Sequence, residues 1–127
     1  MDSSALLAIL LNEPDRQRYA DALLAVDGAQ IGAPNYFEAS MVAESQQGPS
    51  GCRDLDQLAA VAGLSVVPFD AVHVDAAREA FRRYGEGRHR AALTFGDCCA
   101  YALARTLDWP LLFKGDDFAL TDLKRAL

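Results

Sequence analysis

Apolar side chains recur along this chain at two spacings, and each spacing predicts one kind of element. Helical spacing follows the start signal Asp2-Ser3-Ser4 and returns in five later stretches, the second of which opens at Pro14. We therefore predict helices over residues 3–11, 14–26, 36–44, 53–62, 70–84 and 94–107. Short runs rich in branched or aromatic residues predict strands at Gln30–Ala33, Leu64–Pro68 and Trp109–Phe113. The polar run QQGPSG, residues 46–51, predicts a loop.

Alternation of strands with helices indicates a parallel sheet covered by helices on both faces. The length of 127 residues suits one domain that spans residues 1–127. In such folds the carboxyl ends of the strands share one edge of the sheet, and ligands bind in the crevice there. Acidic residues stand just after predicted strands or in the first turns of helices: Asp2, Glu38, Asp97, Asp116 and Asp117. We expect these acids to meet at that edge.

The helix predicted to end at Leu107 is apolar on nearly every side, which indicates a buried helix. Asp97 lies in its first turn, and a buried carboxylate is rare unless it is paired or bound to metal. The alternative is local, because Thr94 and Asp97 have the spacing of a capping box. Asn35 and Glu38 have the same spacing, so Glu38 carries the same alternative. Neither local reading explains why acids so far apart in sequence occupy equivalent places.

The amino-acid composition bears on the cellular compartment of the protein and on the kind of ligand that it binds. The chain is 51% hydrophobic, and no apolar run is long enough to span a bilayer. Its three cysteines, two of them adjacent, argue against a disulfide framework and favour a reducing cytoplasm. The net charge of −6 disfavours nucleic acid as a partner overall, but basic residues crowd one short stretch: Arg78, Arg82, Arg83, Arg88, His89 and Arg90. This stretch suits a phosphate-bearing ligand, and a solvated helix face is the alternative.

Converging carboxylates repel one another, and a hard divalent cation such as Mg²⁺ or Mn²⁺ would remove the repulsion. A cation held in this way can lower the pKa of a bound water and stabilise charge on a phosphoryl oxygen. With arginines nearby to hold phosphates, the pattern favours hydrolysis of a phosphodiester. The chain has no GxxxxGK[ST] loop, which disfavours nucleotide hydrolysis of the P-loop kind.

Four blocks of the sequence together resemble one family. They are DSSALLAILLNEPD from Asp2, NYFEAS from Asn35, RHRAALTFGDCCAYALA from Arg88 and LLFKGDDFALTDL from Leu111. In this order and spacing they resemble the PIN domain, and more closely the VapC toxins of bacterial VapBC toxin–antitoxin pairs. The resemblance covers essentially the whole chain.

The resemblance implies a three-layer α/β/α sandwich with a short parallel sheet and a magnesium- or manganese-dependent endoribonuclease activity. It implies a cognate VapB-like antitoxin as the inhibitor, a dimeric toxin, and RNA, often transfer RNA, as the substrate. On the matching positions, Asp2 and Asp97 are the main metal ligands, and Glu38 completes the site or orients the attacking water. Ser4 and Thr94 supply supporting hydroxyls. We expect Arg82, Arg83, Arg88 and Arg90 to hold the RNA backbone.

Two departures from the family pattern qualify these expectations. Members usually carry three or more apolar residues before the first acid, as a central strand, whereas only Met1 precedes Asp2 here. We expect either a true start further upstream or a shortened strand that weakens the metal site. The sequence GDD also offers Asp116 and Asp117 for the fourth acid, and we favour Asp117, which directly precedes Phe118 as in the family's Gly-x-Asp-Phe pattern. The rival functions are a PIN-type nuclease acting on structured DNA and a catalytically weak module that binds RNA or a partner.

Overall fold

Three of the six α-helices begin at a side chain that caps them, and the order of the helices along the chain is the predicted one. The computed structural model describes all residues from Met1 to Leu127. Asp70, for example, accepts hydrogen bonds from Val72 N at 3.0 Å and His73 N at 3.2 Å at the start of the fifth helix. The elements are α1 (Ser3–Leu10), α2 (Arg16–Leu24), β1 (Gln30–Gly32), α3 (Ala33–Gln47), α4 (Pro49–Val61), β2 (Ser65–Val67), α5 (Ala71–Tyr84), α6 (Phe95–Leu107) and the 3-10 helix η1 (Asp117–Leu120).

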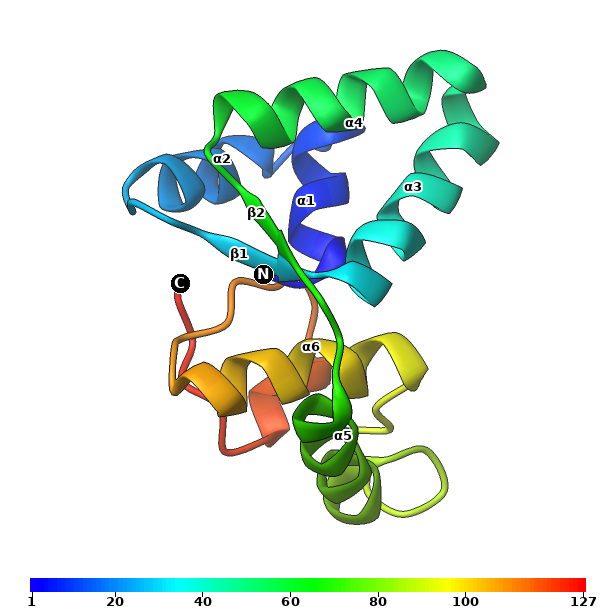
Figure 1. Cartoon of the computed structure of the whole chain (residues 1–127), viewed down its shortest axis with the longest axis vertical. Helices are drawn as coiled ribbons and strands as arrows, with labels where there is room; N and C mark the ends of the chain where they lie inside the picture. Colours follow the sequence, from blue (N-terminus) through cyan, green and yellow to red (C-terminus); the bar gives the residue numbers. More distant parts are fainter.

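The sheet consists of two short parallel strands between two layers of helices. Strand β1 pairs with β2 in a register that sets Ile31 opposite Val66. Helices α1 to α4 lie on one side of the strands and α5 and α6 on the other (Figure 1). The three-layer α/β/α class with a short parallel sheet is therefore confirmed. None of the helices is both long enough and apolar enough to cross a membrane.

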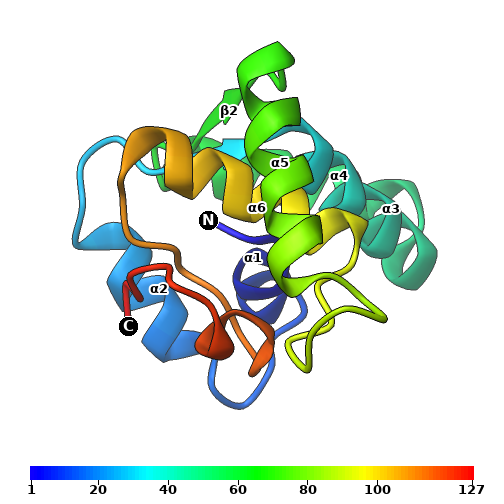
Figure 2. The same cartoon turned by 90° about the horizontal axis from the view of Figure 1, so that it is seen from below.

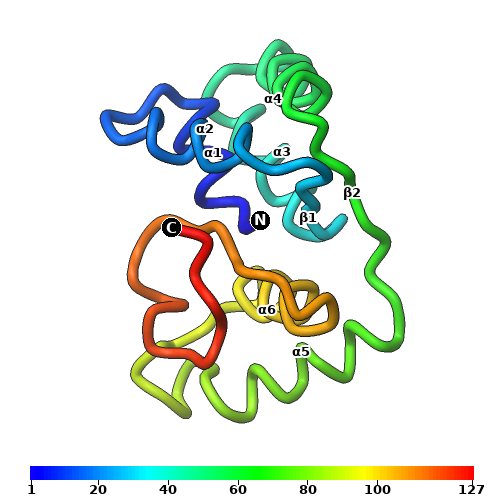
Figure 3. Tube along the Cα trace, turned by 90° about the vertical axis from the view of Figure 1, so that its left-hand side faces the viewer, coloured from blue at the N-terminus to red at the C-terminus, as the bar shows by residue number.

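The start of the chain lies between β1 and the segment that follows α6. Met1 N donates a hydrogen bond to Gln30 O at 2.8 Å, and Asp2 N donates one to Leu112 O at 2.9 Å. The prediction of a strand over Trp109–Phe113 is wrong, because this segment joins the sheet through no ladder. It is extended next to Asp2, and its one bridge pairs Leu111 with Arg125 of the tail. A single backbone hydrogen bond to Asp2 does not make a strand. Figure 3 shows the segment that follows α6, in orange, passing beside the start of the chain.

Each helical layer has its own hydrophobic core. One core joins α1 to α4 and includes Leu6, Leu23, Ile31 and Leu55, all nearly or fully buried. The second core joins α5, α6 and the tail, and its members include Ala80, Tyr84, Leu93, Tyr101, Leu111 and Phe118. In the view from below, the chain start lies at the centre of the molecule, near α1 and α6 (Figure 2). Asp2 is thereby placed where the two layers meet.

The loop predicted over residues 46–51 does not form. Helix α3 continues to Gln47 and α4 begins at Pro49, so only Gly48 separates them. Gly48 has a φ of 70°, a left-handed conformation that glycine adopts without steric cost. Pro49 then opens α4, because proline suits the first turn of a helix, where its missing N–H has no partner to lose. The two helices thus meet at a tight corner rather than through a loop.

The predicted capping box of Asn35 and Glu38 is also wrong. Helix α3 starts at Ala33, after Gly32, and no side chain caps it. Asn35 and Glu38 therefore lie inside the first turns of the helix, and their side chains serve contacts between elements.

Candidate functional site

Asp2 occupies the buried centre of the candidate site. It precedes α1, and its Oδ2 accepts a hydrogen bond from Ser4 N at 3.0 Å, which caps the helix. Only 4% of the residue is exposed. Burial raises the pKa of Asp2 to about 6, against the opposing effect of the Ser4 hydrogen bonds, and the nearby charges of Asp97 and Glu38 raise it further. The site therefore holds negative charge that the protein itself does not neutralise.

Glu38 reaches the same place from α3. Its Oε1 accepts a hydrogen bond from Ser3 Oγ, which ties α3 to the first turn of α1. Its carboxylate lies against Gly96 of α6, where a β-carbon would stand only 2.6 Å from Glu38 Oε2. Glycine at position 96 thus leaves the space that the carboxylate fills.

Asp97 both caps its helix and belongs to the acid cluster. Its Oδ2 accepts a hydrogen bond from Thr94 N at 3.0 Å, and Asp97 N donates one to Thr94 Oγ1 at 3.4 Å, which is a complete capping box. The local alternative for Asp97 is therefore real. It does not displace the carboxylate from the site, because the Asp97 charge acts on Asp2 and on Asp117.

The two candidates for the fourth acid, Asp116 and Asp117, lie on the turn between Phe113 and Phe118. These two rings are buried and pack with centroids 5.1 Å apart, so they close the base of the turn. Gly115 reverses the chain there with a φ of 99°. Burial raises the pKa of Asp117, and the charges of Asp97 and Asp116 add to the effect. Asp97 thus acts on Asp117, and this favours Asp117 over Asp116 as the fourth acid.

Asn35 belongs to the site, although its sequence spacing indicated only a cap. It is fully buried, and its Nδ2 donates to Gly96 O at 2.9 Å and to Asp2 Oδ1 at 3.5 Å. Its Oδ1 has no hydrogen-bond partner. The amide thereby links the elements that carry Asp2, Glu38 and Asp97. An asparagine one turn before an acid on the same helix face was the only signal for it in the sequence.

The two hydroxyls expected to support the site are placed differently. Thr94 Oγ1 accepts the hydrogen bond of Asp97 N, as the capping box requires. Ser4 Oγ instead accepts a hydrogen bond from Lys114 N at 3.0 Å. Ser4 therefore supports the turn that carries Asp117, and its backbone N–H also donates to Asp2.

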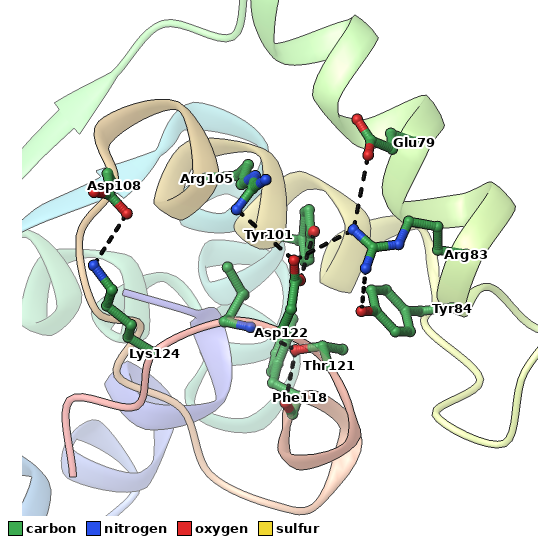
Figure 4. Close-up of polar contacts among 11 residues, drawn as sticks. Glu79, Arg83, Tyr84, Tyr101, Arg105, Asp108, Phe118, Thr121, Asp122 and Lys124 are labelled. Carbon is green, nitrogen blue, oxygen red and sulfur yellow. Dashed lines mark hydrogen bonds and ion pairs between the residues drawn. The ribbon is translucent and has the colours of Figure 1, made fainter.

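The arginines expected to hold the RNA backbone are Arg82, Arg83, Arg88 and Arg90, and one of them, Arg83, is paired within the protein. The Arg83 guanidinium bonds to Asp122 Oδ2 at 3.3 Å and to the Tyr84 hydroxyl at 2.9 Å, and it lies 3.7 Å from Glu79. Figure 4 shows Asp122 at the centre of this network, with Arg83 and Arg105 directed toward it. Tyr101 also donates to Asp122, at 2.8 Å.

This network fastens the tail to α5 and α6, so Arg83 is engaged within the protein. Arg78 of the same stretch lies 3.8 Å from Asp75, whereas Arg82, Arg88 and Arg90 are exposed and form no ion pair. Arg88 lies over the ring of Phe81 at 4.9 Å, and Arg82 and Arg90 point to no acidic partner. Only these three side chains are available to a phosphate without breaking an existing bond.

Comparison with known proteins places this arrangement in a family. The PIN domain model matches residues 1–124. The chain belongs to the PIN-domain family, in its VapC branch. It is 46% identical over 123 residues to Ribonuclease VapC of Mycolicibacterium smegmatis, with 97% of this chain and 95% of that protein covered. It is 44% identical to Ribonuclease VapC30 of Mycobacterium tuberculosis over 97% of this chain and 94% of that protein. Ribonuclease VapC28 of the same organism is 43% identical, with 100% and 96% covered.

The acids of this PIN domain suit a divalent cation in type, although their side chains do not converge tightly enough to enclose one. No three Asp, Glu, His or Cys side chains lie close enough together to hold a metal ion. The donors are all carboxylate oxygens, which Mg²⁺ and Mn²⁺ prefer. Asp2 is buried beside two further negative charges.

Proposed function

We propose that this chain is a metal-dependent endoribonuclease and the toxin of a toxin–antitoxin pair. The observation that supports the proposal is that Asp2, Glu38 and Asp97 come from three different elements and that the charges of Glu38 and Asp97 act on the buried Asp2. Relatives whose names are Ribonuclease VapC support RNA as the substrate, with nearly full coverage of both chains. Transfer RNA is the kind of RNA that we expect first.

The residues have separate tasks in this proposal. Asp2 and Asp97 would hold Mg²⁺ or Mn²⁺, and Asp117 would complete the charge of the site. Such a cation, when bound, lowers the pKa of a coordinated water and stabilises charge on the phosphate. Glu38 would accept a hydrogen bond from the attacking water and orient it toward phosphorus. Asn35 would keep Asp2 and the start of α6 in place through its bonds to Asp2 Oδ1 and Gly96 O.

The RNA backbone would lie on the free arginines. Arg82, Arg88 and Arg90 are exposed near the carboxyl end of α5 and in the connection that leads to α6. Their positive charges would hold phosphates and offset the net charge of −6, which otherwise repels nucleic acid. Arg83 is the least suited of the four, because binding a phosphate would compete with Asp122.

A protein partner would cover apolar surface beside the site. Phe95, next to Gly96 and Asp97, is 81% exposed, and Phe37, next to Glu38, is 64% exposed. Phe95 also lines an open groove of about 430 Å³ with Phe69, Phe81 and Val74. Large exposed apolar side chains at one place indicate a partner surface. A VapB-like antitoxin and a second copy of this chain, forming a homodimer, are the partners that we propose for it.

Cleavage of defined substrates tests the proposed function. We expect cleavage of single-stranded or looped RNA in the presence of Mg²⁺ or Mn²⁺, loss of cleavage with a chelator, and loss in Asp97→Asn. Preferential cutting of structured DNA would favour a DNA-directed PIN nuclease instead. Metal binding without cleavage of either polymer, measured by calorimetry, would identify a module that only binds RNA or a partner.

A further inference from the structure

Lys114 forms hydrogen bonds through both its backbone N–H and its side chain, and it is the first residue of the turn that carries Asp117. Its backbone N–H donates to Ser4 Oγ at 3.0 Å. Its Nζ donates to Asp15 Oδ1 at 2.8 Å and also to Glu13 Oε2. The turn is thereby tied to the first turn of α1 and to the connection between α1 and α2.

The ion pairs of Lys114 differ from the other lysine pair of the chain in their surroundings. The side chains of Lys114, Glu13 and Asp15 are 34%, 35% and 39% exposed. The pair of Lys124 with Asp108 has exposures of 65% and 81%. One ammonium that bridges two partly shielded carboxylates fixes geometry better than a fully solvated pair does. Lys114 is therefore suited to hold a backbone segment in place.

The turn that Lys114 opens sets the position of Asp117. Phe113 and Phe118 close the base of the turn, and Gly115 reverses the chain. Asp117 itself is exposed, and no hydrogen bond from its side chain fixes it. Its distance from Asp97 is consequently set by the backbone of the turn, whose free side is anchored through Lys114.

We propose that Lys114 is a positioning residue that keeps Asp117 beside Asp97 through its bridge to Glu13 and Asp15. Lys114 would act through the carboxylate of Asp117 and would touch neither RNA nor the cation. The inference rests on the proposed function, because it assigns Lys114 a part in building the same acid site.

A double-mutant cycle tests the inference. Lys114→Met keeps the unbranched apolar stem and removes the charge, Lys114→Arg keeps the charge, and Lys124→Met is the matched control. We expect Lys114→Met to lower kcat about ten- to a hundredfold, with KM for RNA nearly unchanged and Mn²⁺ affinity by calorimetry reduced by a similar factor. Lys114→Arg should recover most of the loss, and Lys124→Met should lose nothing.

The decisive comparison uses Asp117→Asn. If Lys114 acts through Asp117, then adding Lys114→Met to Asp117→Asn lowers kcat no further. Losses that multiply, or a change in melting temperature alone, would overturn the inference. Should Lys114→Met fail to fold, the Glu13→Gln and Asp15→Asn double variant removes the same bridge and must give the same kcat and Mn²⁺ effects. A native chain that binds Mn²⁺ and cuts no RNA would contradict the proposed function, and the Mn²⁺ affinities would still test Lys114.

Discussion

Replacing Asp2 by Asn should stabilise the metal-free protein, and the gain should depend on pH. Burial and the neighbouring acids raise the pKa of Asp2 to about 6 from the 3.8 of an unperturbed aspartate. An acid whose pKa is higher in the folded protein destabilises the fold when it is ionised. This cost is absent below about pH 3.8, grows as the pH rises through about 6, and is complete above about pH 7.

The magnitude follows from the two pKa values. At about 1.4 kcal/mol per pKa unit, ionised Asp2 costs the folded protein about 3 kcal/mol at neutral pH. In a domain of this size that corresponds to about 10 °C in Tm. Asparagine keeps the oxygen that accepts the Ser4 hydrogen bond. The figure is an upper limit, because the new amide nitrogen would face Asn35 Nδ2, which now donates to Asp2 Oδ1.

Chemical denaturation of both proteins at several pH values measures the effect. The difference in the free energy of unfolding should be largest at about pH 7.5 and should nearly vanish near pH 4. Asp54→Asn is the matched control, since Asp54 is exposed on α4 and its loss also removes one negative charge. A stability difference that does not vary with pH, or an Asp2→Asn protein that is less stable at pH 7.5, would refute the account of Asp2 as a buried, uncompensated charge.

Three further variants test other parts of the structure. Gly96→Ala should leave Tm unchanged or slightly raised and should reduce RNA cleavage. The β-carbon of the alanine would displace the carboxylate at the end of the flexible Glu38 side chain. Cleavage at the native rate would contradict this expectation. Arg88→Ala with Arg90→Ala should weaken RNA binding and flatten its dependence on salt, measured by fluorescence anisotropy; an unchanged salt slope would show that they bind no phosphate. Asp122→Asn should lower Tm at neutral pH. Tyr101, Arg83 and Arg105 lower the pKa of Asp122 against the opposing effect of burial. The difference in Tm from the native protein should therefore shrink as the pH falls through this lowered pKa.

The pattern of the sequence predicted the elements whose signals are local. The helix predicted from residue 70 begins next to its cap, Asp70, and Thr94 caps α6, as its spacing from Asp97 indicated. The loop over residues 46–51 was a wrong prediction because Gly48 alone turns the chain and Pro49 starts a new helix. The strand expected at Trp109–Phe113 failed for a different reason. A strand forms only where neighbouring backbone pairs with it along a ladder, and here there is one hydrogen bond from Asp2 and a single bridge to the tail.

Contacts between distant residues account for what the sequence left open in the site. The arginines form one cluster in the sequence, and only the fold shows that Arg83 is paired with Asp122. Asn35 has the spacing of a cap, yet its amide contacts Asp2 and Gly96 O instead. Lys114 carries no signal at all, because its partners lie about a hundred residues earlier in the chain. In each case the neighbouring sequence is equally compatible with a surface residue that contacts nothing, so it does not reveal the contact.

The first turn of α6 shows why a structural and a functional role need not exclude each other. A carboxylate at the third position of a helix satisfies a free N–H and is favoured by the helix dipole, so Asp97 is held where it is for local reasons. Asp2 obeys the same logic at the start of α1. Helix starts that face a common sheet edge thus bring charged carboxylates together, and the repulsion that remains at Asp2 is what a bound cation would relieve.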